Sequence, residues 1–263
     1  MNAYPATRFF DQLYFIGTDH FSCFVINTGD GLVMLDCMEP TEEYTKLIID
    51  SFGELGLDLN DLKAILITHG HGDHYGTANY FRDNYGCKVY MSKTDYEYAR
   101  NDTSGPMGAL TWEIKDFLED GDVFELGSLK LYVFSTPGHT PGCLSFVFNV
   151  TDEGRPHMAA LWGGTGIPRS AQMRMEYLKS TIYFAKQTEA LGVDVEIATH
   201  PFVDAGLQRL EVLRSMPDGV PNPFVLGKEG YKYYEQMFQD ICIEALTKDA
   251  VKLDELDPPK IKR

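Results

Sequence analysis

One short polar cluster constrains this chain more than any other part of its sequence. It follows the apolar run Leu62–Thr68, which predicts a buried strand. Imidazole and carboxylate groups are donors that zinc prefers, and the two intervening glycines let the backbone turn tightly enough for neighbouring side chains to face one space. Burying four such groups without a cation would cost several kcal/mol. We therefore expect a zinc site here, formed by His69, His71, Asp73 and His74.

A single metal ion could not easily use all four donors, so the cluster points to two ions. His69 and His71 stand two residues apart and can share one ion, whereas Asp73 and His74 are adjacent and are directed toward a second. Two later histidines complete the sets: His139 lies in a loop rich in glycine and proline, and His200 follows a predicted strand. Three protein ligands per zinc leave a position for water, which is typical of catalytic sites.

The two remaining histidines are rival candidates. His157 lies in a turn-rich hairpin, and we expect it to face solvent. His20 precedes strand residues and is a candidate for the lining of the cleft.

Strand and helix patterns occur in the same order in both halves of the chain, a β meander followed by a helix. Two such halves indicate two sheets packed face to face with helices outside, an α+β fold. The expected strands are Leu13–Gly17, Cys23–Thr28, Leu32–Asp36, Leu62–Thr68, Lys88–Met91, Val123–Leu126, Leu129–Phe134, Leu144–Val150, Met158–Trp162 and Val193–Ala198. The main expected helices are Thr41–Phe52 with Thr41 as N-cap, one through Ala78, Phe81 and Tyr85, Thr94–Arg100, Ala171–Ala190 and about Glu229–Thr247.

We expect residues 1–263 to form one continuous domain, with a helical C-terminal extension from about 216 to 263 docked on it. The segment Asn101–Leu110 carries two glycines and a proline and predicts a mobile loop. The last helix has an apolar stripe that should dock on the body: Tyr231, Tyr234, Phe238, Ile241 and Ala245.

The cluster His69–His74 resembles the HxHxDH motif of the metallo-β-lactamase superfamily, and His139 and His200 follow in the family's order. The resemblance spans nearly the whole chain and is specific for the superfamily rather than for a substrate. It implies a four-layer αβ/βα sandwich with two zinc ions at the sheet edge. Most of these hydrolases also have an aspartate that bridges both metals, but Ala159–Gly166 has no acid.

That absence resembles the third subclass of metallo-β-lactamases, in which one zinc has three histidines and the other has Asp-His-His. The resemblance implies His69, His71 and His139 at the first zinc, and Asp73, His74 and His200 at the second. Two features depart from the subclass: Gly164 stands where a serine often helps to hold the substrate carboxylate, and no signal peptide precedes the first strand.

The expected activity is hydrolysis of a cyclic amide, foremost a β-lactam. A water bridging two zinc ions would lose a proton near neutral pH and act as the nucleophile. Asp73 and His74 are the expected catalytic residues, with Asp73 foremost a ligand that also orients the hydroxide. Thr165, Arg169 and His20 are candidates for binding the substrate.

Several alternatives remain open. Another hydrolase of the superfamily could act on a lactone, a thioester, or another amide or ester. Phosphodiester hydrolysis is disfavoured because the bridging aspartate is missing. A flavin-linked diiron oxidoreductase would carry glutamate near Gly70 or Gly72 and a flavin domain, and neither is present. A non-catalytic zinc-binding protein would bind metal without turnover.

The net charge of −16 excludes strong attraction to nucleic acid or anionic lipid, so the expected partner is a small molecule, with no membrane and no particular oligomeric state implied. Five widely spaced cysteines without a CxxC pair predict buried reduced thiols. The N-terminus lacks a basic segment followed by an apolar stretch, which favours the cytoplasm, although an exported chain trimmed of its signal would look the same.

Overall fold

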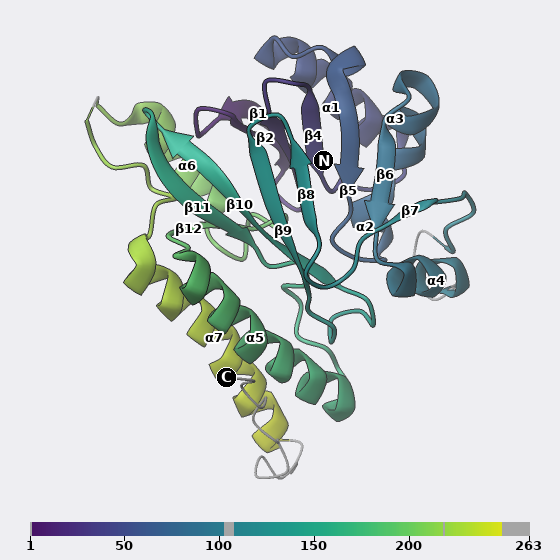
Figure 1. Cartoon of the computed structure of the whole chain (residues 1–263), viewed down its shortest axis with the longest axis vertical. Coiled ribbons are helices and arrows are strands. Elements are labelled where there is room, and N and C mark those ends of the chain that lie inside the picture. Colours follow the sequence, from purple (N-terminus) through teal and green to yellow (C-terminus); the bar gives the residue numbers. More distant parts are fainter. Residues whose placement is uncertain (1, 103–107, 218, 249–263) are drawn as a thin grey trace.

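Two mixed β-sheets form the centre of the computed structural model, which describes residues 2–102, 108–217 and 219–248 (Figure 1). The first sheet has 7 strands in the order β1-β2-β3-β4-β5-β6-β7, and the second has 5 strands in the order β12-β11-β10-β9-β8. The first sheet consists of β1 (Ala3–Arg8), β2 (Leu13–Thr18), β3 (Ser22–Asn27), β4 (Leu32–Leu35), β5 (Leu62–Leu66), β6 (Lys88–Met91) and β7 (Asp116–Phe117). The second consists of β8 (Val123–Leu126), β9 (Leu129–Ser135), β10 (Leu144–Asp152), β11 (Arg155–Leu161) and β12 (Val195–Ile197).

Each sheet combines an antiparallel meander with parallel strands. In the first sheet, β1 to β4 pair antiparallel, whereas β4, β5, β6 and β7 pair parallel. In the second, only β11 and β12 pair parallel. The parallel strands β5 and β12 end at the loops that carry His69 and His200, so the sheets bring these distant loops to one edge.

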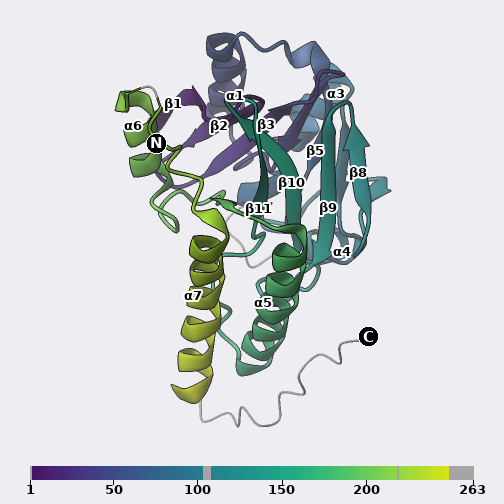
Figure 2. The same cartoon turned by 60° about the vertical axis from the view of Figure 1, so that its left-hand side comes forward.

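Helices cover the outer face of each sheet (Figures 1 and 2). They are α1 (Glu42–Leu55), the 3₁₀ helix η1 (Leu59–Asp61), α2 (Gly72–Tyr75), α3 (Ala78–Tyr85), α4 (Lys93–Asn101), α5 (Ala171–Leu191), α6 (Gly206–Ser215) and α7 (Gly227–Lys248). The long helices α5 and α7 pack against each other.

Local chemistry fixes the ends of α1. The Oγ1 atom of Thr41 accepts a hydrogen bond from the backbone N–H of Tyr44 at 3.3 Å, which confirms the predicted N-cap. At the other end Gly56 adopts φ = 68°, a left-handed conformation that favours glycine and ends the helix.

Three buried hydrophobic clusters fill the spaces between layers. One lies between the first sheet and its helices, one between the two sheets, and one between the second sheet and the pair α5 and α7. Three interlayer cores require four layers, so the expected α+β sandwich of the αβ/βα type is confirmed.

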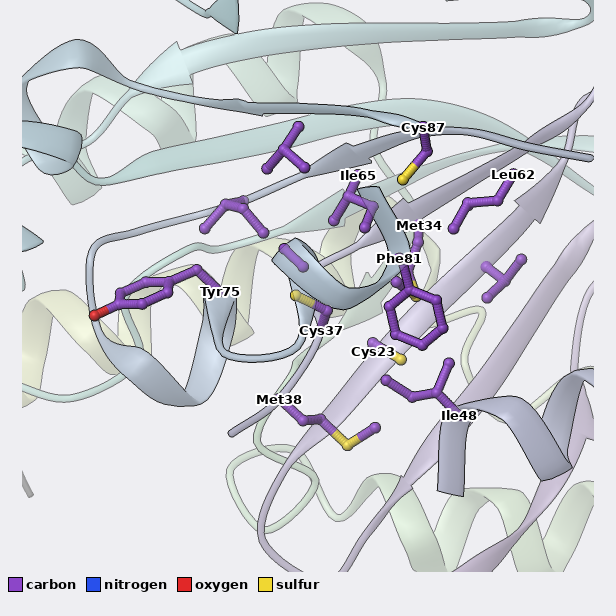
Figure 3. Close-up of a cluster of buried hydrophobic side chains, with 14 of the residues drawn as sticks. Cys23, Met34, Cys37, Met38, Ile48, Leu62, Ile65, Tyr75, Phe81 and Cys87 are labelled. Carbon is purple, nitrogen blue, oxygen red and sulfur yellow. The ribbon is translucent and has the colours of Figure 1, made fainter. Parts of the chain in front are cut away.

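Figure 3 shows the cluster beneath α1 and α3, where Phe81 and Ile48 meet the sheet residues Met34 and Ile65. Three cysteines lie within this cluster, and all five cysteines of the chain are buried and unpaired. The expectation of buried reduced thiols is therefore confirmed.

Several details differ from the sequence expectations. The chain begins with an additional strand, β1, that the hydrophobic pattern did not predict, because only one of its residues is fully buried. On α7 the predicted stripe is partly wrong, since Ile241 is 44% exposed. The buried residues of α7 are Tyr231, Glu235, Phe238, Cys242 and Leu246. Residues 103–107 of the predicted loop and 249–263 of the predicted extension lie outside the described residues. No helix in the described ranges is both long and apolar enough to cross a bilayer.

Candidate metal centre

The polar cluster lies where β5 passes into a short helix. His69 and His71 occupy the loop after the strand, and α2, Gly72–Tyr75, carries Asp73 and His74. The carboxyl ends of parallel strands are where loops from separate parts of a chain meet. The loop after β9 brings in His139, and the loop after β12 brings in His200.

The first group consists of three imidazoles. His69 Nε2 lies 3.1 Å from His71 Nδ1, and His139 Nε2 lies 3.1 Å from the same His71 atom. Three nitrogen atoms from two distant loops therefore face one point. The second group consists of Asp73, His74 and His200. The Nε2 atoms of its two histidines are 3.2 Å apart, and Asp73 Oδ2 lies 3.5 Å and 3.7 Å from them.

The structure thus brings together all six side chains that the sequence assigned to metal binding, in the same two sets of three. In each set the candidate ligand atoms lie within 4.8 Å of one another. The rival candidate His157 lies away from both groups. His157 pairs with Asp194 at 2.7 Å and its side chain is only 16% exposed, so the expectation that it faces solvent is wrong.

Hydrogen bonds on the far side of each ring orient the histidines of the second group. Asp36 at the end of β4 accepts hydrogen bonds from His74 Nδ1 at 2.6 Å and from the Thr68 hydroxyl at 2.8 Å. His200 Nδ1 donates to the carbonyl of His20 at 3.0 Å. Because each Nδ1 is held in this way, each Nε2 is left to face a metal.

The first group is oriented in the same manner. His139 Nδ1 donates to the carbonyl of Gly166 at 2.6 Å, and His69 Nδ1 lies 3.1 Å from the Thr68 hydroxyl. His71 Nε2 lies 3.5 Å from the Tyr98 hydroxyl, which leaves Nδ1 directed inward. Partners of this type are typical of metal-bound imidazoles.

Burial and the neighbouring charges together shift the pKa values of these rings. Burial lowers the pKa of His69 well below its usual range, with the nearby His74 acting in the same direction, and it lowers the pKa of His139 to about 4. Burial also acts to lower the pKa of His74, but the carboxylates of Asp73 and Asp36 outweigh it and raise that pKa overall. Neutral imidazoles whose lone pairs face one another need a cation between them, so the donor set fits a metal ion.

Glycines make room for His139. A Cβ atom on Gly164 would lie 2.4 Å from the Cβ of His139, and one on Gly166 would lie 2.8 Å from its Cε1. Atoms cannot approach this closely, so a serine at position 164 would displace His139. The packing around His139 therefore favours glycine at position 164.

A cavity of about 710 Å³ opens beside the two groups. Arg169 is its only cationic side chain other than histidine among the described residues, and Glu39 and Asp102 contribute carboxylates. Thr165 and His20 are not among the described residues that line it. The remaining lining side chains are mostly apolar or aromatic: Phe21, Tyr75, Tyr98, Ile167, Pro168 and Met173. This size and composition suit a small organic molecule.

Sequence reasoning missed two residues that contact the ligand loops. Asp36 contacts His74, and its position at the end of a buried apolar run is a usable signal in the sequence. Asp95 has no such signal, because its carboxylate bonds to Gly70, Thr140 and Gly142, which lie far from it in the sequence.

The sequence profile described as the Metallo-beta-lactamase superfamily matches residues 17–152, just over half of the 263 residues. The chain belongs to the metallo-β-lactamase superfamily. A probable metallo-hydrolase of Burkholderia pseudomallei is among its relatives, 32% identical over 103 residues that cover 37% of this chain and 34% of the relative.

The curated relatives of this superfamily member match only in part. An uncharacterized protein of Mycobacterium leprae is 37% identical over 103 residues, which cover 34% of this chain and 47% of the relative. A hydroxyacylglutathione hydrolase, GloC, of Haemophilus influenzae is 29% identical over 123 residues, which cover 40% of this chain and 57% of the relative. The match therefore spans about half the length of these relatives.

Solved structures match the whole fold. A subclass B3 metallo-β-lactamase of Bradyrhizobium japonicum superimposes with a TM-score of 0.81 at 24% identity, covering 95% of this chain and 96% of the other. The FEZ-1 metallo-β-lactamase of Legionella gormanii gives a TM-score of 0.83 at 24% identity, covering 95% and 98%. The fold is thus the metallo-β-lactamase fold.

Proposed function

We propose that this protein is a dizinc hydrolase that opens a cyclic amide, foremost a β-lactam. The observation that carries the proposal is the pair of three-donor groups beside one cavity of about 710 Å³. Imidazole and carboxylate donors suit zinc, and three donors per ion leave a coordination position for water. His69, His71 and His139 would hold one ion, and Asp73, His74 and His200 the other.

Two zinc ions held by these residues would supply a water of lowered pKa as nucleophile and Lewis acids for the scissile carbonyl and the leaving group. The residues of the chain prepare this chemistry. Asp73 would contribute the one anionic donor and would orient the attacking water by accepting a hydrogen bond from it. Asp36 keeps His74 in the tautomer whose Nε2 faces the centre, through the 2.6 Å contact at Nδ1.

Arg169 is the proposed contact for the substrate carboxylate. It lines the cavity, and a guanidinium recognises a carboxylate in two-pronged geometry. Thr165 and His20 are secondary candidates, since neither lines the cavity among the described residues. The apolar wall formed by Ile167 and Met173 would cover the rest of a compact bicyclic substrate.

A second candidate is hydrolysis of a thioester. It is favoured by the partial similarity to a protein named hydroxyacylglutathione hydrolase. The same donors would serve a thioester, a lactone or another amide or ester, because these substrates share a carbonyl carbon that is attacked by water.

Metal analysis combined with a substrate panel tests the proposal. We expect purified protein to contain about two zinc ions per chain and to hydrolyse the chromogenic β-lactam nitrocefin, and its expression to protect bacteria from β-lactams. Turnover of a glutathione thioester or a lactone without nitrocefin hydrolysis would select the second candidate. Two bound ions without turnover of any of the three substrates would mean a non-catalytic zinc-binding protein.

We further propose that residues 1–263 form one domain, with the helical end from about 216 docked through α7. Its support is the packing of α7 on α5 and on the second sheet. We expect fluorescence and circular dichroism to report one cooperative unfolding transition at the same midpoint. Two separate transitions would contradict a single domain. We also propose that the substrate is a small molecule and that the protein acts in the cytoplasm.

A further inference from the structure

We propose that Asp95 is a positioning residue for the first metal site, acting as the common anchor of its two ligand loops. Asp95 lies in the first turn of α4 and is completely buried. It belongs to neither donor group and does not line the cavity. A buried carboxylate is costly unless its oxygens accept hydrogen bonds, so its partners reveal its role.

Those partners come from both ligand loops. Asp95 Oδ2 accepts a hydrogen bond of 2.7 Å from the backbone N–H of Gly70, which stands between His69 and His71. The same oxygen accepts a hydrogen bond of 2.6 Å from the hydroxyl of Thr140, the neighbour of His139. Its Oδ1 accepts a third, of 2.6 Å, from the N–H of Gly142. One carboxylate therefore joins two segments that lie far apart in the sequence.

The packing of α4 against these loops supports the same role. A Cβ atom on Gly70 would lie 2.8 Å from the backbone oxygen of Asp95, and one on Gly142 would lie 2.6 Å from its backbone nitrogen. Both glycines therefore let the loops approach the start of α4 closely enough to share one side chain.

This anchor matters because the first group draws its ligands from both loops. His139 must approach His71 to 3.1 Å, and neither loop alone fixes that separation. Hydrogen bonds to a buried carboxylate are short and directional, so Asp95 sets the spacing before any metal binds. Asp95 does not orient the second group directly, because none of its three hydrogen bonds involves Asp73, His74 or His200. The inference rests on the proposed metal centre but not on the proposed substrate.

Replacement of the carboxylate by an amide is the sharpest test. In Asp95→Asn one oxygen can still accept from one side, but the NH₂ group faces a donor on the other, so at least one hydrogen bond is lost. Metal-free protein would be titrated with Zn²⁺ against a competing chelator and with Co²⁺ followed by its visible absorption. We expect affinity at the first site to fall about 10–100-fold, with an altered Co²⁺ spectrum, and affinity at the second site to change less than about twofold.

Ser92→Ala is the matched control, because it removes the N-cap of the same helix without removing a bond to either loop. It should lower Tm yet leave both metal affinities within about twofold. Equal loss of first-site affinity in Ser92→Ala, or wild-type affinity and spectrum in Asp95→Asn, would overturn the proposal. If Asp95→Asn does not fold, Thr140→Val is the alternative test. It removes the hydrogen bond from the Thr140 hydroxyl to Asp95 at nearly constant side-chain volume, and it should lower the metal affinity of the first site about threefold or more.

The two proposals fail in different ways. Wild-type protein that binds two ions but does not hydrolyse nitrocefin contradicts the proposed substrate and leaves the role of Asp95 standing. Wild-type protein that binds no ion at the first site contradicts both.

Discussion

Asp73 is the only anionic side chain among the six proposed ligands, and its Oδ2 lies 3.5 Å and 3.7 Å from the Nε2 atoms of the two histidines of its group. Its charge offsets that of a divalent ion, and neither His74 nor His200 can replace it. We expect Asp73→Ala to lower the zinc content from about two ions to about one per chain and to reduce kcat/KM at least about 100-fold, while the circular dichroism spectrum is retained.

Asp240→Ala provides the control for that change. It removes the same charge from an exposed position on α7, so zinc content and rate should match the wild type. Equal activity of the two variants would contradict the assignment of Asp73.

Residue types alone were sufficient to predict the six candidate ligands, since histidine and aspartate clustered after buried strands are typical of metal binding. The residues that hydrogen-bond to these ligands and to their loops could not be predicted in this way. Asp36 reaches His74 across 38 positions, and Asp95 reaches Gly142 across 47. Such bonds depend on how strands and helices pack, and no local pattern in one sequence records that.

At the scale of elements, periodicity predicted most strands and helices but chose the wrong face for part of α7. The predicted stripe and the observed one share Tyr231 and Phe238 and then diverge, because Ile241 is exposed while Cys242 is buried. Glu235 is absent from the predicted stripe, yet it is only 8% exposed. Hydrophobicity scales cannot anticipate a carboxyl group that is buried with a hydrogen-bond partner.

Glu235 makes the docking of α7 dependent on pH. Its Oε1 accepts a hydrogen bond of 2.6 Å from Thr188 on α5, and burial raises the pKa of Glu235 from 4.5 to about 7. The folded state therefore binds a proton that the unfolded chain releases above pH 4.5. This contribution to stability is complete below pH 4.5 and is lost as the pH rises through about 7.

Glu235→Gln keeps a neutral group in place. Between about pH 5 and about pH 8 we expect its free energy of unfolding to fall by about 1–3 kcal/mol less than that of the wild type. Denaturant unfolding at several pH values measures the difference. Glu229→Gln, at an exposed position on the same helix, should follow the wild-type profile. Parallel profiles for Glu235→Gln and the wild type would show that the carboxyl is ionised throughout.

At the scale of the whole molecule, the proposed metal centre would join the two halves of the sandwich. His69, His71, Asp73 and His74 follow the first sheet, whereas His139 and His200 follow strands of the second. Bound ions would therefore link the halves across the edge where their loops meet. Without metal the protein would keep its three hydrophobic cores but lose this link, so it should remain folded and become less stable.

A ligand present at 100 times its Kd stabilises the folded state by about 2.7 kcal/mol, which corresponds to a shift in Tm of roughly 5–10 °C for a chain of this size. Removal of metal with a chelator should lower Tm by about that amount, and excess Zn²⁺ should restore it. Mg²⁺ should fail to do so, because it prefers oxygen donors and five of the six proposed ligands are histidines. Calorimetry across a range of free Zn²⁺ should show Tm rising with the logarithm of its concentration; a Tm indifferent to Zn²⁺ would mean that the six side chains converge without binding it.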